Sequence, residues 1–566
     1  MFILGRPPAG RETKGDWVRG NVRRLALPLA AVVVLVIAGT AGGASKGGTM
    51  VFAGASDPTY LDPALVSDGE SFRVTEQMFE GLVKLKPGTT KIVPALATKW
   101  KLAGGKTWTF WLRKGVKFHD GTPWNAAAAC YNFNRWYNWT GPFQDPSATY
   151  YYQTTYGGFR HNEVANLSPP LFHSCAAHGK YQIVVKLNRP SGVFFPSLVI
   201  SSFAMQSPTA LKKYGADQAS LTGGTFKPTG TYAFQHPTGT GPFKFSSWTI
   251  GQKVELVRNN KYWGKKPALD KIVIRPISDN EARYQALKTG EVNAFDLAPP
   301  QDIGGLSGDS RLKVVKRPAF NVAYVTFHQG PGSPMNDLKV RQAAAYGLDR
   351  STVVKQFYYG TGRVANEFEP PSLFGWTNKV KKYPYNPTKA KQLLNSSSCH
   401  VPCKIDFWYP TAVSRPYMPD PKRNFEAFQA SLNNSGFDVT AHTAPWRPTY
   451  VPKVNEGSAG DLNLIGWTGD YGDPDNFLGT FFRNYNPQFG FHNPAIEGIL
   501  NRALNEPNFQ KRVALYKKAN ILIMNYLPGV PYAHATPALG AEKRVQKLIA
   551  TPVGGVWFQF ATVGGQ

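Results

Sequence analysis

Segments with the pattern of β-strands alternate with segments that carry helix signals along this chain of 566 residues. In TWTFWL, the side chains of Trp108, Phe110 and Leu112 occupy every second position, which is typical of a strand with one buried face. The stretch PFKFSSWTIGQKVELVR predicts two further strands joined by a turn at Gly251. A chain in which such strands alternate with helices is expected to fold as an α/β protein.

Helix ends can be located from their capping signals. After the strand KIVIRPI, Ser278 is a candidate N-cap with Glu281 three residues later, and Gly290 suits a left-handed C-terminal cap. Another helix is expected to begin with Asn386 as N-cap and Pro387 as its first residue. The stretch NDLKVRQAAAYGLDR predicts a helix that packs on the core through one stripe: Val340, Ala343, Ala344, Gly347 and Leu348.

The N-terminus has the order of a secretory signal. Six basic residues precede the uncharged stretch LALPLAAVVVLVIAGTAGGAS, which begins at Leu25 and ends in small residues. We expect residues 1–44 to be a signal peptide cleaved after about Ala44, or an N-terminal membrane anchor, because the apolar length is borderline for spanning a bilayer. An internal buried helix is the alternative. The protein is therefore expected to be exported to the cell surface, the periplasm or the extracellular space.

Four cysteines follow this segment, and in an oxidising compartment an even number favours disulfide bonds. Cys399 and Cys403 are close enough to pair locally, which leaves Cys130 to pair with Cys175. A metal site that includes His400 is the alternative, but it lacks a second pair of ligands at a suitable spacing. We predict no bound metal and no other cofactor.

The composition indicates a globular chain with a basic surface. With 42% hydrophobic residues, the chain can bury a large core and form two or more lobes. The formal net charge is +28, but the basic residues are dispersed in pairs such as Lys265 with Lys266 and Lys381 with Lys382. No long basic block or regular row of aromatic residues accompanies them, so we predict no nucleic-acid partner. A basic surface near an anionic cell envelope is the simpler explanation.

The stretch GWTGDYGDPDNFLGTFF, from Gly466 to Phe482, places carboxylates among aromatic residues. A calcium loop would need a fixed ligand spacing and a late glutamate, which are absent here. A pair of glycosidase carboxylates has no recognisable remote partner. A serine hydrolase is also disfavoured, because the sequence GxSxG occurs only at 43–47, with no strand before it. The remaining explanation is a pocket wall that presents one carboxylate to a positively charged ligand group.

Seven stretches, in this order, resemble the extracytoplasmic solute-binding proteins of family 5, which include the oligopeptide-, dipeptide- and nickel-binding proteins of ABC transporters. They are EGLVKL, WTFWLRKGVKFHDGTPW, GTGPFKFSSWTIGQKVELVRNNKYWG, LDKIVIRPI, NEARYQALKTGEV, KVRQAAAYGLDR and GWTGDYGDPDNF. The similarity runs from about Thr49 to near the C-terminus. It is strongest to the dipeptide-binding branch, and the cysteine-containing insertion at about 140–180 resembles actinobacterial members.

This resemblance implies a two-lobed α/β clamp of the periplasmic-binding-protein type, with an extra domain in the first lobe. Lobe I would comprise 45–88, 203–318 and 536–566, the extra domain 89–202, and lobe II 319–535. The implied function is that of a receptor of an ABC importer, which binds short peptides between the lobes and delivers them to a membrane permease. The protein would be a monomer without catalytic activity. The alternatives are a non-peptide solute, such as an oligosaccharide or a metal chelate, and a secreted hydrolase.

The resemblance also implies which residues contact the ligand. Asp470 would receive the α-amino group of a peptide, and Trp467 would lie beside the ligand. The backbone of Gly466, Trp467 and Thr468 would pair with the peptide main chain like an added strand. By contrast, Asp473 and Asp475 are interpreted as turn residues in DPDN.

Contacts from the first lobe are expected just after the sequence LDP. The candidates there are Ser67, Asp68 and Gly69, and an ordinary surface loop is the alternative. An arginine in the cleft would bind a free ligand carboxylate. The sequence leaves three arginines open for this role: Arg363, Arg415 and Arg447.

Overall fold

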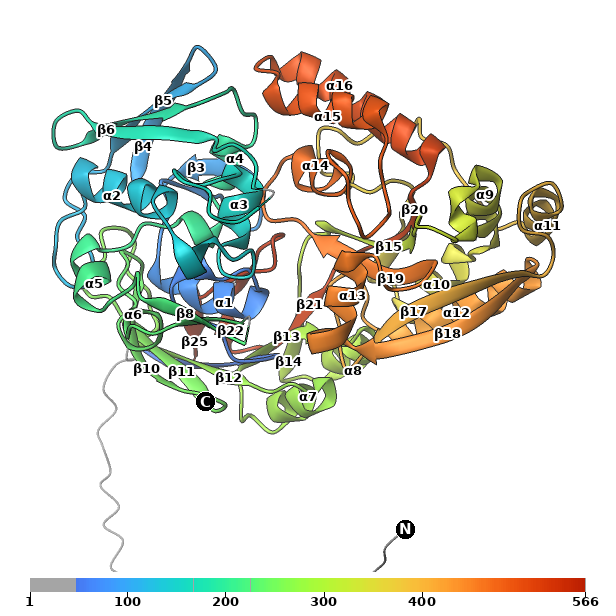
Figure 1. The fold of residues 1–566 in the computed structure, drawn as a ribbon. Helices are drawn as coiled ribbons and strands as arrows, with labels where there is room; N and C mark the ends of the chain where they lie inside the picture. The colour runs from blue at the N-terminus through green and yellow to red at the C-terminus, as the bar shows by residue number, and fades with distance from the viewer. Residues whose placement is uncertain (1–46, 166, 224, 565–566) are drawn as a thin grey trace, which may run out of the picture. The chain divides into compact units, whose positions relative to one another are not determined.

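The computed structural model describes residues 47–564, apart from 166 and 224 (Figure 1). The predicted signal or anchor at 1–44 lies outside the described residues. Within the described part of the chain, no helix has both the length and the apolar character needed to cross a membrane.

A mixed seven-stranded sheet contains both early and late parts of the chain. Its order is β10–β11–β12–β1–β13–β21–β14, and β1 lies parallel to both of its neighbours. The bounds are β1 (Thr49–Gly54), β10 (Phe243–Thr249), β11 (Lys253–Arg258), β12 (Lys271–Pro276), β13 (Ala294–Ala298), β14 (Leu312–Lys316) and β21 (Ala538–Glu542). The predicted hairpin is confirmed, because β10 and β11 pair antiparallel on either side of Gly251.

Two helices cover this sheet. Helix α1 (Gly69–Met78) buries Val74 and Met78 in the same cluster as Met50 and Phe52 of β1. Helix α7 (Asn280–Lys288) follows β12, and Gly290 has the positive φ expected of it. The prediction that Ser278 caps α7 is wrong. Asp279 is the N-cap and its side chain accepts the N–H of Ala282, because the helix begins one residue later than the capping-box pattern indicated.

A separate antiparallel sheet has the order β4–β5–β7–β6. Its strands are β4 (Ala97–Ala103), β5 (Thr107–Leu112), β6 (Phe172–Ala177) and β7 (Gln182–Leu187). Helices α2 (Ala126–Tyr137) and α3 (Tyr150–Tyr156) contribute buried residues to the same core cluster as this sheet. Residues of β5 alternate between half-buried and buried as the sequence predicts. Cys130 of α2 and Cys175 of β6 lie at disulfide distance, with their Cα atoms 5.2 Å apart.

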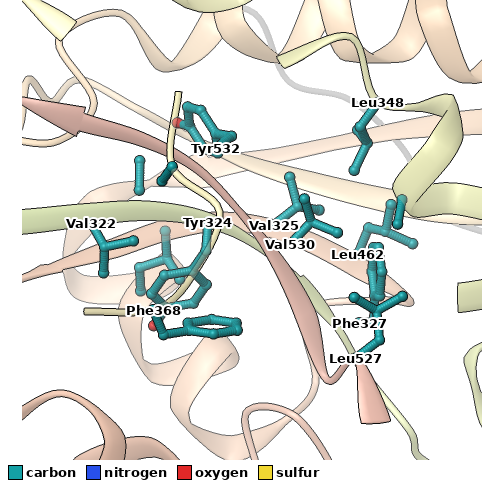
Figure 2. Packing of buried hydrophobic residues seen from close by; sticks show 14 of the residues in the cluster. Val322, Tyr324, Val325, Phe327, Leu348, Phe368, Leu462, Leu527, Val530 and Tyr532 are labelled. Carbon is teal, nitrogen blue, oxygen red and sulfur yellow. The ribbon is translucent and has the colours of Figure 1, made fainter. Parts of the chain in front are cut away.

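The six-stranded sheet has the order β16–β20–β15–β19–β17–β18. Its strands are β15 (Asn321–Phe327), β16 (Gly362–Val364), β17 (Cys403–Thr411), β18 (Phe437–Pro445), β19 (Leu462–Thr468) and β20 (Gly529–Ala535). Every residue of β15 and β20 is buried. Figure 2 shows Val322, Tyr324 and Val325 of β15 packed beside Val530 and Tyr532 of β20.

The helices beside this sheet come from the same later part of the chain, which Figure 1 colours from yellow-green to red. They include α9 (Leu338–Gly347), α10 (Arg350–Phe357), α11 (Pro387–Asn395), α12 (Pro421–Asn434), α14 (Leu478–Phe482), α15 (Pro494–Asn505) and α16 (Phe509–Tyr526). The predicted apolar stripe of α9 is buried, and Asn386 caps α11 with Pro387 as its first residue. Cys399 and Cys403, just before β17, are paired with a Cα–Cα distance of 5.3 Å.

The chain passes from the seven-stranded to the six-stranded sheet after β14 and returns after β20. The two crossing segments are hydrogen-bonded to each other. Arg317 donates its main-chain N–H to the carbonyl of Pro537 at 2.8 Å. The Asn321 side chain donates to the carbonyl of Ala535 and accepts its N–H, both at 2.9 Å. Paired crossings of this kind allow two bodies to rotate about a short hinge.

Candidate ligand-binding site

Strand β19 carries one edge that is only partly paired. It pairs with β15 along its whole length, from Leu462 to Thr468. On its other side it pairs with β17 only at Leu462 and Asn463. The Leu464 carbonyl accepts the hydroxyl of Tyr450 at 2.6 Å. Among the described strands, none pairs with residues 465–468 on this side, so their main-chain groups form an edge that an extended ligand can join.

Gly466 is required at this edge by close packing. A β-carbon at Gly466 would overlap the ring of Tyr417 and the carbonyl of Val322. Tyr417 is buried; burial raises the pKa of its phenol to about 12, and the nearby charge of Arg415 limits the rise. Any larger residue at 466 would therefore displace a buried aromatic ring from the site.

Trp467 and Thr468 have polar atoms that meet no hydrogen-bond partner in the described chain. Both residues are half-buried, yet the Trp467 Nε1 and Thr468 Oγ1 atoms are inaccessible and unpartnered. The Trp467 ring packs edge-on against Phe481, with ring centroids 6.0 Å apart. Buried polar atoms are normally hydrogen-bonded, so these two atoms are exceptions at the end of β19.

Asp470 follows β19 and accepts a hydrogen bond at each carboxylate oxygen. The Tyr151 hydroxyl donates to Oδ1 at 2.6 Å, and the Asn476 side-chain amide donates to Oδ2 at 3.0 Å. Burial raises the pKa of Asp470 to about 6, although both hydrogen bonds oppose the rise. An ionised carboxylate can accept about four hydrogen bonds, so two remain for ligand donors.

Asp473 and Asp475 lie in the buried turn that was predicted, which is a 3₁₀ turn at Pro474–Asn476. Each carboxylate also forms an ion pair. Arg512 of α16 binds Asp473 in a bidentate manner at 2.6 and 2.8 Å, and Arg483 pairs with Asp475. These pairs occupy the two carboxylates in the fold itself. No local pattern predicts Arg512 as the partner of Asp473, because the two residues are 39 positions apart along the chain.

The three candidates from the first lobe lie at the start of α1. Asp68 is the N-cap, and its carboxylate accepts four hydrogen bonds from the donors of neighbouring residues, at 2.6–3.1 Å. Its capacity as an acceptor is therefore used within its own turn. Ser67 and Gly69 are exposed. Phe72, one turn further along α1, packs against Tyr151 with ring centroids 5.7 Å apart, so Tyr151 connects the start of α1 with Asp470.

The three candidate arginines have different surroundings. Arg415 lines a small pocket of about 20 Å³ together with Leu297 and Thr536 from the seven-stranded sheet and the crossing segment. Its guanidinium lies 4.4 Å from the centroid of the Trp446 ring, and it forms no ion pair with the described residues. Arg363 and Arg447 are exposed and lie outside this pocket. The pocket has room for about one water molecule, and Arg415 is the one of the three candidate arginines that lines it. A guanidinium without an ion-pair partner among the described residues is suited to a ligand carboxylate.

Two α/β bodies joined by paired crossings, with an open strand edge and a pocket beside the crossings, define a two-lobed binding protein. The chain belongs to the bacterial extracellular solute-binding proteins, family 5, because the family model for the middle region matches residues 91–489. This is a family of binding receptors and not of enzymes, and members of its dipeptide-binding branch are among the relatives of the chain.

Two curated relatives cover nearly the whole chain. Heme-binding protein A of Haemophilus influenzae is 30% identical over 537 residues, which cover 92% of this chain and 93% of that protein. The dipeptide-binding protein of Escherichia coli is 29% identical over 541 residues, which cover 93% and 97%. Among solved structures, the ABC transporter-associated periplasmic binding protein DppA of Helicobacter pylori, in complex with the peptide STSA, superposes with a TM-score of 0.76. It is 27% identical, with 92% of this chain and 98% of that chain covered.

Proposed function

We propose that this protein is the extracytoplasmic receptor of an ABC importer, that it binds short peptides between its lobes, and that it delivers them to a membrane permease. The observation that carries the proposal is the open edge of β19, with the Asp470 carboxylate just after it. Arg415, which has no ion-pair partner among the described residues, lies in the small pocket beside the crossing segments. The names of the Escherichia coli and Helicobacter pylori relatives support a peptide as the ligand.

In this proposal the two charged ends of a peptide meet opposite charges. Asp470 binds the α-ammonium, and Arg415 binds the C-terminal carboxylate. An unpaired charge in a dry cleft costs several kcal/mol, so each end needs its partner. Gly466 lies four positions before Asp470 and packs against Tyr417, which is two positions after Arg415. This contact places the segment that contains Arg415 beside the strand that leads to Asp470.

The peptide main chain would pair with the backbone of Gly466, Trp467 and Thr468 in the manner of an added strand. Such pairing accepts any sequence, because it uses no side chain of the ligand. Ser67 and Gly69 would contact the ligand from the first lobe, beside the N-cap Asp68. Their exposure and their position one turn before Phe72 support this role.

The domain limits that we propose are those implied by the family resemblance. We place lobe I at 45–88, 203–318 and 536–566, the extra domain at 89–202 and lobe II at 319–535. The strands of the seven-, four- and six-stranded sheets fall within these three ranges respectively. The segment 1–44 would direct export, after which both disulfides form, and the protein would act as a monomer at the outer face of the membrane.

The test compares two aspartate variants of lobe II in calorimetric titrations with a free dipeptide. Asp470→Asn removes the counter-charge of the ammonium, so it should cost about 2–5 kcal/mol of binding free energy. Asp438→Asn changes an exposed carboxylate of β18 and should bind as the wild type does. Wild-type affinity in Asp470→Asn would reject the proposed anchor. Recovery of cleaved peptide would indicate a hydrolase, and binding of a neutral sugar without any peptide binding would indicate another solute.

A further inference from the structure

The hydrogen bond between Tyr151 and Asp470 joins parts of the chain that are 319 residues apart. Tyr151 lies on α3, and its side chain belongs to the core cluster of the four-stranded sheet. Asp470 follows β19 of the six-stranded sheet. The Asp470 carboxylate, which follows a strand of the six-stranded sheet, therefore accepts a hydrogen bond from a helix that packs with the four-stranded sheet.

Aromatic side chains surround this contact. Tyr151 is 8% exposed and packs against Phe72 of α1, and its ring lies edge-on to Tyr150 with centroids 5.2 Å apart. Burial raises the pKa of Tyr150, and the negative charge of Asp470 contributes to the rise. The side-chain amide of Asn476, in the turn that follows Asp470, donates a hydrogen bond to the other carboxylate oxygen of Asp470.

Resting on the function proposed above, we propose that Tyr151 is a positioning residue for the ligand ammonium. Its hydroxyl fixes the orientation of the Asp470 carboxylate, so that the remaining acceptor sites face the cleft. Because the hydroxyl comes from α3 and the carboxylate from the strand edge, the complete ammonium site is assembled from both sides of the cleft. The extra domain that contains α3 is then a functional part of the site.

The alternative is that Tyr151 contributes packing alone, and the pH dependence of binding distinguishes the two roles. A donor to the ionised carboxylate lowers its pKa, so loss of the hydroxyl should raise the pKa of Asp470 further above about 6. Binding of an ammonium needs the ionised form, and affinity falls as the pH drops through this pKa. In Tyr151→Phe, the midpoint of that fall should move to higher pH.

Other titratable groups lie near Asp470, but their titration would not produce the shift in the pH midpoint that is expected for Tyr151→Phe. Tyr150 and Tyr471 have pKa values raised by burial, so both stay neutral between pH 5 and 8, the roughly neutral range in which a normal tyrosine is protonated. The two carboxylates that follow, Asp473 and Asp475, are each held by an arginine: Arg512 and Arg483, respectively. The variant Tyr151→Phe leaves all of these groups in place.

The experiment measures the affinity for free dialanine by calorimetry from about pH 5 to 8 in Tyr151→Phe and in Tyr152→Phe. Tyr152 is the matched control, because it is the next residue of α3, it is also buried, and its hydroxyl has no partner among the described residues. Tyr151→Phe removes a hydrogen bond to a charged group, so we expect it to lose roughly ten- to hundredfold in affinity near neutral pH. The pH midpoint of its binding curve should also move upward. Tyr152→Phe should match the wild type, and circular dichroism should show that both variants are folded.

Wild-type affinity and an unshifted midpoint in Tyr151→Phe would overturn the inference, and so would an equal loss in Tyr152→Phe. Asp470→Asn separates this failure from failure of the proposed function. If Asp470→Asn loses affinity while Tyr151→Phe does not, only the role of Tyr151 is rejected. If Asp470→Asn binds dialanine as the wild type does, both are rejected. In the double variant, the loss caused by Tyr151→Phe should be smaller than in the single variant, because the two residues act through one interaction.

Discussion

Burial acts differently on the carboxylates of this protein, depending on the groups that each one meets. Asp470 receives two side-chain hydrogen bonds and has a pKa of about 6, whereas Glu367 receives a main-chain N–H and has a pKa of about 8. Asp296 is also buried, yet the charges of Arg317 and Arg73 hold its pKa well below the usual range. Burial alone favours the neutral form, and only a nearby cation reverses this effect.

The pKa of Glu367 leads to a prediction for stability. Because burial raises it, the folded state binds more protons than the unfolded state between about pH 4.5 and 8, and stability falls as the pH rises through this window. Glu367→Gln carries no charge and keeps an acceptor for the N–H of Thr377. We therefore expect the variant to melt at a higher temperature than the wild type at pH 8–9, with the difference disappearing near pH 5. Calorimetric melting across this range is the measurement, and equal melting temperatures at pH 9 would contradict the prediction.

At the scale of elements, local patterns predicted the strands and helices well, and tertiary contacts decided the rest. The caps at Asn386 and Gly290 were found from the sequence because their signals are local, and Ser278 was displaced by a neighbour that caps equally well. The carboxylate and the strand before it were identified through a family resemblance. Tyr151 as a partner of Asp470 could not be predicted, because no local pattern relates residues so far apart. The choice of Arg415 likewise depended on the pocket that it lines.

The ion pair between Asp473 and Arg512 joins the turn after β19 to α16, and it gives a prediction at this scale. Both side chains are buried, with exposures of 2% and 9%. Asp473→Asn would leave the Arg512 charge buried without its partner, so we expect a loss of about 3–5 kcal/mol in the free energy of unfolding. Asp420→Asn is the matched control, since it removes an exposed pair with Arg423 and asparagine still caps α12. Denaturant titration measures the free energy of unfolding of both variants. A similar loss in the two would contradict the prediction, because the buried pair would then stabilise the fold no more than the exposed pair.

In the whole molecule, the proposed function requires two lobes that close on a ligand. The crossing segments at 317–320 and 536–537 are bonded to each other, so rotation there leaves both large sheets intact. Tyr151 contacts both Asp470 and Phe72 of α1, so the two parts of the chain meet at this tyrosine. The energy for closure comes from contacts that exist only in the closed form.

Closure predicts a change in size when the ligand binds. Small-angle scattering with saturating dipeptide should give a smaller radius of gyration than the free protein gives. The melting temperature should rise as well, since a hundredfold excess over the dissociation constant contributes about 2.7 kcal/mol of stability. The variant Asp470→Asn, at the same peptide concentration, serves as the control and should stay close to the free form. An unchanged radius of gyration at proven saturation would indicate a rigid surface binder.

The α-ammonium of a short peptide is the group that we propose this protein recognises at Asp470. The most direct measurement is a calorimetric titration of the wild-type protein with a dipeptide and with the same dipeptide acetylated at its N-terminus. Acetylation removes the positive charge and adds bulk, so it leaves the carboxylate without a counter-charge. We expect tight binding of the free dipeptide and a loss of at least about a hundredfold on acetylation, which corresponds to roughly 2.7 kcal/mol. Equal affinity for the two peptides would contradict it.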